Sequence, residues 1–200
     1  ATRSENLHNS PSRGLSGVKG VSLLSPSLRK KSKKVWRAAI TINYTTHFLG
    51  TFTTFEDAVA AYNKGDFSTA LQIWRPLADQ GDAMAQIRIG GLYADGDGVP
   101  QSYGEAMNWF RKAADQGNAR AQFNIGTLFY NSQGTPRSYP EALKWFNLAA
   151  DQGHSSALFS LGDMFAQGQG VLKNEVEASA KYRLAAEQGH AGAQFTLALR

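Results

Sequence analysis

The sequence predicts a mainly α-helical protein. We expect an α-solenoid of helix-turn-helix repeats preceded by a small α+β module, a three-stranded antiparallel sheet with one helix. Residues 83–190 contain three gapless copies of a 36-residue sequence, and such a period is the signature of a repeat array. Residues 14–54 instead carry three short runs rich in Val, Ile, Thr and aromatic residues, a composition typical of strands.

The charge distribution divides the chain in the same way. Residues 1–54 hold nine Lys or Arg residues against Glu5 alone, a net charge of +8. Residues 55–200 hold twelve basic and fifteen acidic residues, a net charge of −3. This asymmetry favours contact with a polyanion through the first part only.

Several classes of site are not expected. The chain has no cysteine, and its four histidines are scattered without ligand spacing, so we expect no metal and no cofactor. No apolar run approaches the roughly 18 residues of a membrane span, so we expect no membrane partner. The repeats show no set of nucleophile, base and oxyanion donors, and we expect no enzyme activity.

Each repeat reads as a helix, a Gly-rich loop, a second helix and a tight turn. The copies occupy residues 83–118, 119–154 and 155–190, with a partial copy at 191–200 and an atypical first unit at 55–82. The first unit is broken at Lys64-Gly65-Asp66, and the whole array spans 55–200. Because the partial copy stops after about one helix, we expect an exposed apolar face there unless more chain follows, and this ending suggests a fragment.

Recurring residues assign roles within the repeat. Ala85, Ile89 and Tyr93 form one apolar face of the first helix. Gly90 recurs as Gly126 and Gly162 in mid-helix, where the absence of a side chain lets the partner helix approach closely. The second helix presents three sets: Ala106, Trp109 and Ala113; Ala142, Trp145 and Ala149; Ala178, Lys181 and Ala185. We expect Trp109 and Trp145 in the core.

The closing turns also recur. Gly117, Gly153 and Gly189 stand where a helix end needs left-handed geometry. His154 and His190 occupy the position held by Asp82 and Asn118 in the earlier copies, so we interpret them as turn residues.

The repeat pattern resembles the Sel1-like repeat family, which is related to tetratricopeptide repeats. The matching elements are the A-x-A-Q start, an L/I-G pair, G-x-G-V or a variant, E-A, W-F, and A-A-x-Q-G. The resemblance covers about 118 residues. It implies a right-handed α-solenoid that holds a protein or peptide partner on its concave face.

The basic part resembles the AP2/ERF-type DNA-binding domain attached to phage-like HNH endonucleases. The match rests on S-G-V-K-G-V-S at 16–22, W-R-A-A-I at 36–40, L-G-T-F at 49–52 and E-D-A-V-A-A-Y at 56–62. The resemblance implies an AP2-like module at 14–63, with the sheet in the DNA major groove and the helix packed behind it. FEDAVAAYN, from residue 55, fits both resemblances, so we hypothesise one helix shared by both parts.

Strand alternation selects the residues that face away from the helix. Arg37, Ala39 and Thr41 fall on the outward face, together with Ser22, Leu24, Thr46 and Phe48. Plant members carry arginines and a tryptophan at several outward positions, so we do not expect their GC-box specificity here. With the basic loop added, the predicted DNA-binding residues are Lys19, Ser22, Arg29, Lys30, Lys31, Lys33, Lys34, Arg37, Thr41 and Phe48. The lysines and arginines are expected to contact phosphates.

Residues 1–13 resemble the linker that follows the catalytic core of HNH endonucleases, A-T-x-x-E-N-x-x-N. The catalytic histidines of that family would lie upstream, so no nuclease activity is expected. The sequence leaves three functions open: a DNA-tethered protein scaffold, the DNA-binding part of an HNH homing-type endonuclease whose catalytic half is missing, and a pure protein-binding solenoid with a vestigial N-terminal piece. We expect a cytoplasmic location, or export if a signal peptide was removed.

Overall fold

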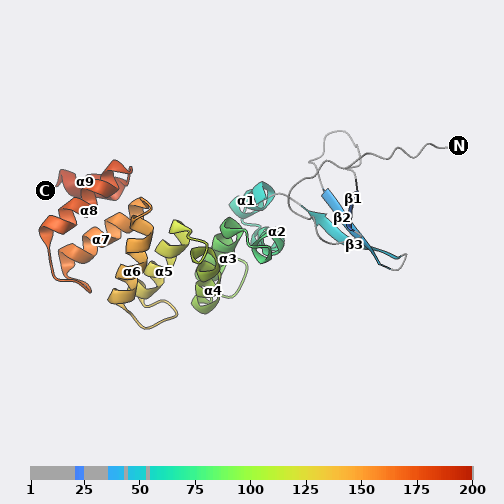
Figure 1. Ribbon diagram of the computed structural model, residues 1–200, viewed down its shortest axis with the longest axis horizontal. Helices are drawn as coiled ribbons and strands as arrows, with labels where there is room; N and C mark the ends of the chain where they lie inside the picture. The colour runs from blue at the N-terminus through green and yellow to red at the C-terminus, as the bar shows by residue number, and fades with distance from the viewer. Residues whose placement is uncertain (1–20, 25–35, 43–44, 53–54, 200) are drawn as a thin grey trace. The chain divides into compact units, whose positions relative to one another are not determined.

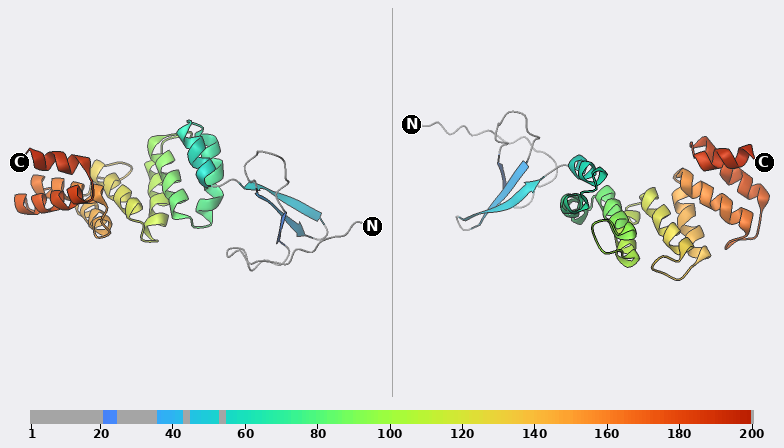
Figure 2. Two further views of the ribbon diagram at one scale, coloured as in Figure 1. Left: turned by 90° about the horizontal axis from the view of Figure 1, so that it is seen from above. Right: turned by 180° about the vertical axis from the view of Figure 1, so that it is seen from behind.

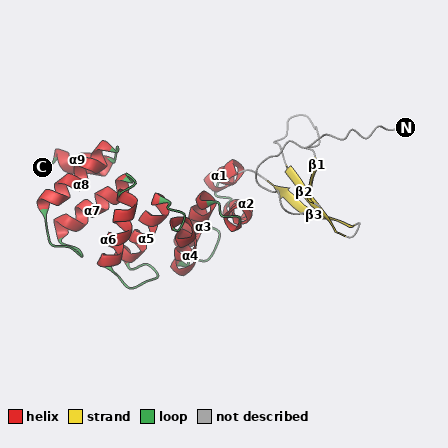
Figure 3. Ribbon diagram, viewed as in Figure 1, coloured by secondary structure: helices red, strands yellow, loops and turns green. Residues whose placement is uncertain are grey.

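The computed structural model describes residues 21–24, 36–42, 45–52 and 55–199. It divides into two compact units, Ala1–Thr53 and Thr54–Arg200 (Figure 1). The first unit contains strands and the second contains helices (Figure 3).

The first unit holds a three-stranded antiparallel sheet in the order β1-β2-β3. The strands are β1 (Val21–Leu24), β2 (Trp36–Ile42) and β3 (Thr45–Phe52). A register shift between Ala38 and Ala39 interrupts the pairing of β2 with β3.

The second unit is a succession of helix pairs. Its helices are α1 (Phe55–Asn63), α2 (Phe67–Asp79), α3 (Ala83–Asp95), α4 (Tyr103–Ala114), α5 (Ala119–Asn131), α6 (Tyr139–Ala150), α7 (Ser155–Gln167), α8 (Glu175–Glu187) and α9 (Ala191–Ala198). Each helix makes its close contacts with the helices before and after it in the sequence, which produces a stack (Figure 2). The predicted mainly α-helical solenoid is therefore present over α1–α9.

The break predicted at Lys64-Gly65-Asp66 separates α1 from α2. Gly65 has a φ of +76°, which is a left-handed conformation that favours glycine. Asp66 caps α2 by accepting a hydrogen bond from the Thr69 N–H at 3.1 Å. The helix predicted to be shared, α1, lies in the second unit and packs on α2. Its packing against a sheet in an AP2-like module stays a prediction.

The mid-helix glycines have the predicted role. A Cβ atom added to Gly90 would lie 2.5 Å from Cε1 of Phe110 in the second helix of the same repeat. At Gly126 the corresponding atom is Cδ1 of Phe146 at 2.6 Å, and at Gly162 it is Cε1 of Tyr182 at 2.5 Å. Because carbon atoms in contact normally stay about 3.5–4.0 Å apart, only glycine lets the two helices pack this closely.

The core continues along the whole stack. Trp109 is buried as predicted, whereas Trp145 is half-buried against the neighbouring cluster. Trp74 is fully buried in the α1/α2 helix pair, where the centroids of the Phe55 and Tyr62 rings lie 6.0 and 5.7 Å from that of the Trp74 ring. The aromatic residues of the array are thus mainly inter-helix core.

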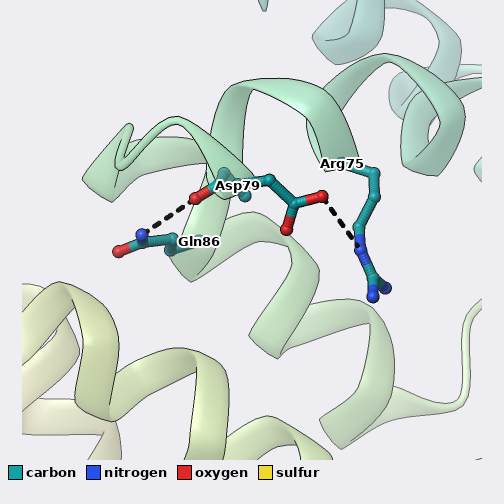
Figure 4. Close-up of polar contacts among 4 residues, drawn as sticks. Arg75, Asp79 and Gln86 are labelled. Atoms are coloured by element: carbon teal, nitrogen blue, oxygen red, sulfur yellow. Dashed lines mark hydrogen bonds and ion pairs between the residues drawn. The ribbon is translucent and has the colours of Figure 1, made fainter.

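Hydrogen bonds from glutamine side chains connect neighbouring helices of the repeat array. Nε2 of Gln86, at the start of the first repeat, donates to the Ala78 carbonyl oxygen of α2 at 3.0 Å (Figure 4). The exposed ion pair between Arg75 and Asp79, 3.7 Å long, lies on the same helix (Figure 4). Gln116 then donates to Gln86 at 2.9 Å, and Gln152 donates to Gln122 at 2.8 Å in the second repeat. These bonds fix the first helices of the first two repeats to the end of a neighbouring helix.

The turn residues cap helices. Gly117, Gly153 and Gly189 all have left-handed φ values, as predicted. His154 is the N-cap of α7, and its Nδ1 accepts a hydrogen bond from the Ala157 N–H at 3.3 Å. His190 caps α9 in the same way. Both histidines thus take the N-cap position that Asp82 and Asn118 hold in earlier repeats.

The last described helix leaves apolar side chains in solvent. Phe195 is 67% exposed and Leu199 is 72% exposed. The exposed apolar face expected at the partial fourth copy is therefore present.

Candidate functional site in the helical unit

A pocket of about 470 Å³ lies between α3 and α5, the first helices of two successive repeats. We call it the α3/α5 pocket. It is lined by Tyr62, Ile87, Arg88, Gly91, Ala94, Asp95, Gln101, Tyr103, Phe110, Arg120, Asn124, Thr127, Leu128 and Gln133. Apolar side chains therefore meet two arginines and several hydrogen-bonding groups in one concavity.

The repeat architecture creates this space. Each first helix packs closely on the second helices next to it in the sequence, so successive first helices are held apart by the helix between them. Gly91 widens the gap, since a Cβ atom added there would meet nothing within 4 Å. Gly91 follows Gly90, whose Cβ position is filled by Phe110. Two adjacent glycines thus serve opposite purposes, close packing on one side and open space on the other.

One wall of the pocket is fixed by a chain of polar contacts. Gln101 donates from Nε2 to the Ala94 carbonyl oxygen at 2.8 Å and to the Tyr103 phenol oxygen at 3.0 Å. Gln133, from the next repeat, donates to the same phenol oxygen at 3.1 Å. The loops that follow α3 and α5 are therefore bridged at the edge of the pocket.

Arg88 is the most unusual lining residue. Its guanidinium carbon lies 6.0 Å from the centroid of the Tyr62 ring and 5.9 Å from that of the Trp74 ring, at the outer range of cation–π contact. Its Nε atom is buried and has no hydrogen-bond partner. A buried donor without a partner costs roughly 1–3 kcal/mol, so such atoms are rare in stable cores.

The other charged groups of the pocket do not neutralise Arg88. Burial raises the pKa of Asp95, and repulsion from Asp97 adds to this effect; no arginine contributes to the shift. Arg120 is exposed at the pocket rim. Within the residues that the structure describes, neither Arg88 nor Arg120 forms an ion pair.

The chemistry of the pocket is recognition by charge and hydrogen bonding. Asn124 and Thr127 add amide and hydroxyl groups beside the two arginines. Over the described ranges, no group of three or more His, Asp or Glu side chains is arranged to hold a metal ion. We treat the pocket as a candidate binding site because it combines apolar side chains with two arginines and neutral hydrogen-bonding groups.

Sequence reasoning did not find the pocket residues. Arg88, Asn124 and Ser160 occupy the same position in the three repeats, and the residue type changes at each copy. Recurrence marks framework positions and therefore passes over this one. The available signal was the opposite one, a polar position that varies two residues before the recurring mid-helix glycine.

The structure gives a partial view of the predicted DNA-binding residues. Ser22 lies in β1, Arg37 and Thr41 lie in β2, and Phe48 lies in β3. In the sheet register Ser22 pairs with Ala39, Ala39 pairs with Phe48, and Thr41 pairs with Thr46. The remaining residues fall outside the described ranges: Lys19, Arg29, Lys30, Lys31, Lys33 and Lys34.

Comparisons with known proteins concern the helical unit. A family model described as Sel1 repeat matches residues 83–118, 119–154 and 155–190. A Sel1 repeat protein from Oxalobacter formigenes is similar in structure, with a TM-score of 0.65 and 35% identity over 70% of this chain and 58% of that one. A protective antigen of uropathogenic Escherichia coli with an SLR fold has a TM-score of 0.62 and 32% identity over 70% of this chain and 34% of its own.

A more distant likeness shows the fold alone. Cysteine rich protein B of Helicobacter pylori has a TM-score of 0.51 and 16% identity, over 72% of this chain and 97% of that one. No curated protein sequence matched the chain significantly. Among the described residues, no helix combines the length and apolar character needed to cross a membrane. The chain spans a little over half of the Oxalobacter protein and about a third of the Escherichia antigen.

Proposed function

The chain belongs to the Sel1 repeat family, and we propose that its helical unit is a non-catalytic scaffold that holds a peptide segment of a protein partner in the α3/α5 pocket. The observation that carries this proposal is the pocket between the first helices of two repeats. Its volume of about 470 Å³ lies within the roughly 300–1,000 Å³ typical of ligand sites.

The architecture supports a protein partner. Solenoids of stacked repeats expose extended surfaces that run over several units, and these surfaces suit chain-like ligands. The pocket draws residues from α1, α3, α4 and α5, so a ligand seated there contacts helix α1 and two repeats of the helical unit at once. Ile87, Phe110 and Leu128 supply apolar contact, while the arginines and amides above them supply directed hydrogen bonds.

The test is a selection of random 12-residue peptides against the full chain, followed by affinity measurement with a blocked pocket. Gly91→Phe places a large side chain in the open space beside Gly91 and leaves the Gly90–Phe110 contact intact. We expect selected peptides to bind the unmodified protein and to lose at least about tenfold in affinity with Gly91→Phe. Gly91→Ala is the matched control, since one methyl group leaves most of the pocket open.

Two results contradict this proposal. One is a selection that yields no binding peptide. The other is a set of peptides whose affinity is equal for the unmodified chain and for Gly91→Phe. The melting temperatures of both variants are the control for folding. Neither substitution is expected to lower the melting temperature, and an unchanged value assigns any loss of binding to the pocket.

We further propose that the basic N-terminal part binds DNA. The observation that favours this is its net charge of +8 over residues 1–54, set against −3 for the rest of the chain. The five cations at Arg29, Lys30, Lys31, Lys33 and Lys34 neutralise phosphates without reading sequence. This proposal describes a DNA-tethered scaffold, a role that favours a cytoplasmic location.

Fluorescence anisotropy of a labelled duplex with the full chain tests DNA binding over a salt series. Replacing Lys30, Lys31, Lys33 and Lys34 by Gln is expected to weaken binding. The slope of log affinity against log salt should become shallower by roughly 0.9 for each phosphate that the variant no longer neutralises. Replacing Arg75, Arg111, Lys144 and Arg183 by Gln removes the same charge from the helical unit and is the matched control.

Two outcomes favour the other functions that the sequence leaves open. Absence of binding at low salt would leave a protein-binding solenoid with a vestigial N-terminal part. Cleavage of the duplex would support an origin in an HNH-type nuclease and contradict a non-catalytic chain.

A further inference from the structure

Arg88 lines the α3/α5 pocket and forms no ion pair within the part of the chain that the structure describes. Its Nε atom is buried without a hydrogen bond, while Tyr62 and Trp74 flank the group at 6.0 and 5.9 Å. The two aromatic rings limit the contact of the cation with water on those sides. An arginine held in this way loses little further freedom when a planar anion docks on it.

A second guanidinium faces the same pocket from the next repeat. Arg120 comes from α5 and Arg88 comes from α3, and both line the α3/α5 pocket. Asn124 and Thr127 lie beside them with neutral hydrogen-bonding groups. Two arginines with neutral polar neighbours match the chemistry of a carboxylate, which accepts hydrogen bonds at both oxygens.

The acidic residue of the pocket does not fill this role. The pKa of Asp95 is raised by burial and by Asp97, which is the reverse of what a neighbouring arginine would cause. Asp95 and the two arginines leave the pocket lining with one excess positive charge, and no other charged side chain lines it.

The surrounding charge makes this positive spot distinctive. Residues 55–200 carry fifteen acidic and twelve basic side chains, so the helical unit as a whole does not attract anions. An acidic peptide therefore gains from the pocket and from little else on this unit. The Arg and Lys side chains elsewhere on the unit are mostly exposed and strongly hydrated, which limits their value for a single carboxylate.

We propose that the α3/α5 pocket recognises a carboxylate of its peptide partner, an Asp or Glu side chain, through Arg88 and Arg120. This inference rests on the proposed peptide-binding function of the same pocket and adds the chemical class of the ligand. Arg88 is the anchor, and Arg120 at the rim orients the incoming peptide.

The test needs a site-resolved signal, because the basic residues 1–54 attract any acidic peptide. The Nε–Hε resonances of ¹⁵N-labelled full-length protein supply it. The probes are acetyl-triglutamate amide and its uncharged counterpart, acetyl-triglutamine amide. The variants are Arg88→Gln, Arg120→Gln and Gly91→Phe, with Arg111→Gln as an equal charge change at an exposed site outside the pocket.

Triglutamate is expected to shift the Arg88 and Arg120 signals with saturation, and triglutamine is not. Arg88→Gln should weaken this binding by about tenfold, Arg120→Gln by a smaller factor, and Arg111→Gln by less than about twofold. Gly91→Phe should abolish the saturating shift. An affinity that Arg88→Gln leaves unchanged would overturn the proposal, as would equal shifts at all arginines.

The outcomes separate this inference from the proposed function. If the selected 12-residue peptides are displaced by Gly91→Phe but contain no acidic residue and tolerate Arg88→Gln, the pocket binds peptides and the carboxylate assignment is wrong. If no peptide depends on Gly91, both proposals are wrong. If both substitutions release acidic peptides, both proposals hold.

Discussion

The two ends of the repeat array share a framework but differ in what they display. At the first interval, between α3 and α5, the pocket measures about 470 Å³ and holds two arginines. Further along, near Tyr130, Ser160 and Asp163, the concavity shrinks to about 60 Å³. The close approach of an aromatic ring to the mid-helix glycine is nevertheless the same at both ends, since an added Cβ atom would lie 2.5 Å from a ring carbon at Gly90 and at Gly162.

The substitutions between the repeats explain the difference. The residue after the packed glycine is Gly91 in the first repeat, Thr127 in the second and Asp163 in the third. In the third repeat the Asp163 carboxylate accepts a hydrogen bond from the Tyr182 phenol at 2.7 Å, and Asp163 lines the smaller concavity. The framework glycine is thus shared by the repeats, while the residue after it differs between the two concavities.

The largest effects are expected where the shared framework is broken. Gly126→Ala places a methyl group about 2.6 Å from a ring carbon of Phe146, which is only 2% exposed and has no room to move. The clash costs about 1–3 kcal/mol and is offset by a gain of about 1 kcal/mol in helix propensity. Urea unfolding should therefore show a net loss of up to about 2 kcal/mol.

Gly91→Ala is the control for Gly126→Ala. Gly91 follows Gly90, the residue of the first repeat that corresponds to Gly126. It gains helix propensity without a clash, and the free energy of unfolding should rise by up to about 1 kcal/mol. Equal changes at Gly126 and Gly91 would mean that the glycine-on-aromatic contact does not set the packing.

The second prediction concerns the hydrogen bond between Tyr182 and Asp163 in the third repeat. Tyr182→Phe removes the hydrogen bond to Asp163 and leaves the buried ring in place. Because a hydrogen bond to a charged group contributes roughly 1.5–3 kcal/mol at most, and this one is part-buried, we expect a loss of about 1 kcal/mol. In the Asp163→Ala background the same substitution should have almost no effect in urea unfolding, and a full loss there would contradict the pairing.

A third prediction uses a departure of the second repeat from its neighbours. The helix C-cap is Gly96 in the first repeat and Gly168 in the third, both left-handed, but it is Ser132 in the second, with a φ of 62°. Since left-handed backbone costs a non-glycine residue roughly 1 kcal/mol, Ser132→Gly should stabilise the protein by about 0.5–1 kcal/mol in thermal unfolding. An unchanged or lower melting temperature would show that the Ser132 hydroxyl compensates fully for its backbone.

The smallest expected effect is a pH dependence of stability that arises from His154, the N-cap of α7. Burial lowers the pKa of His154 below 6.5, with smaller contributions from the charges of Arg120 and His190. The neutral ring accepts the Ala157 N–H, and an imidazolium has no free lone pair to do so. The native state therefore binds the proton less well than the unfolded state. Stability is complete above about pH 6.5 and falls as the pH drops through that range towards the lowered pKa.

His154→Asn is the matched variant, because Asn118 caps the preceding repeat in the same position. Melting temperatures from pH 8 to pH 5 should decline less for the variant than for the unmodified chain. Parallel pH profiles would show that His154 does not contribute to acid sensitivity.

The sequence alone was sufficient for the framework and insufficient for the site. Recurrence at one phase identified Gly90, Gly126 and Gly162, because close helix contact tolerates only one residue type. It also identified the turn positions of His154 and His190, although their capping bonds need ring orientations that sequence does not supply. The pocket depends on which side chains from two repeats meet across a gap. Arg88 and Arg120 occupy different positions of their repeats, so no periodic pattern connects them.

The most direct test of peptide binding in the α3/α5 pocket is to locate a bound peptide on the helical unit. Intermolecular nuclear Overhauser effects can be measured between a selected 12-residue peptide and methyl-labelled Ile, Leu and Val of the full chain. Peptide binding in the α3/α5 pocket predicts contacts to Ile87 and Leu128, which line it. Contacts confined to Leu172 and Val176, the exposed apolar side chains near the start of α8, would contradict it.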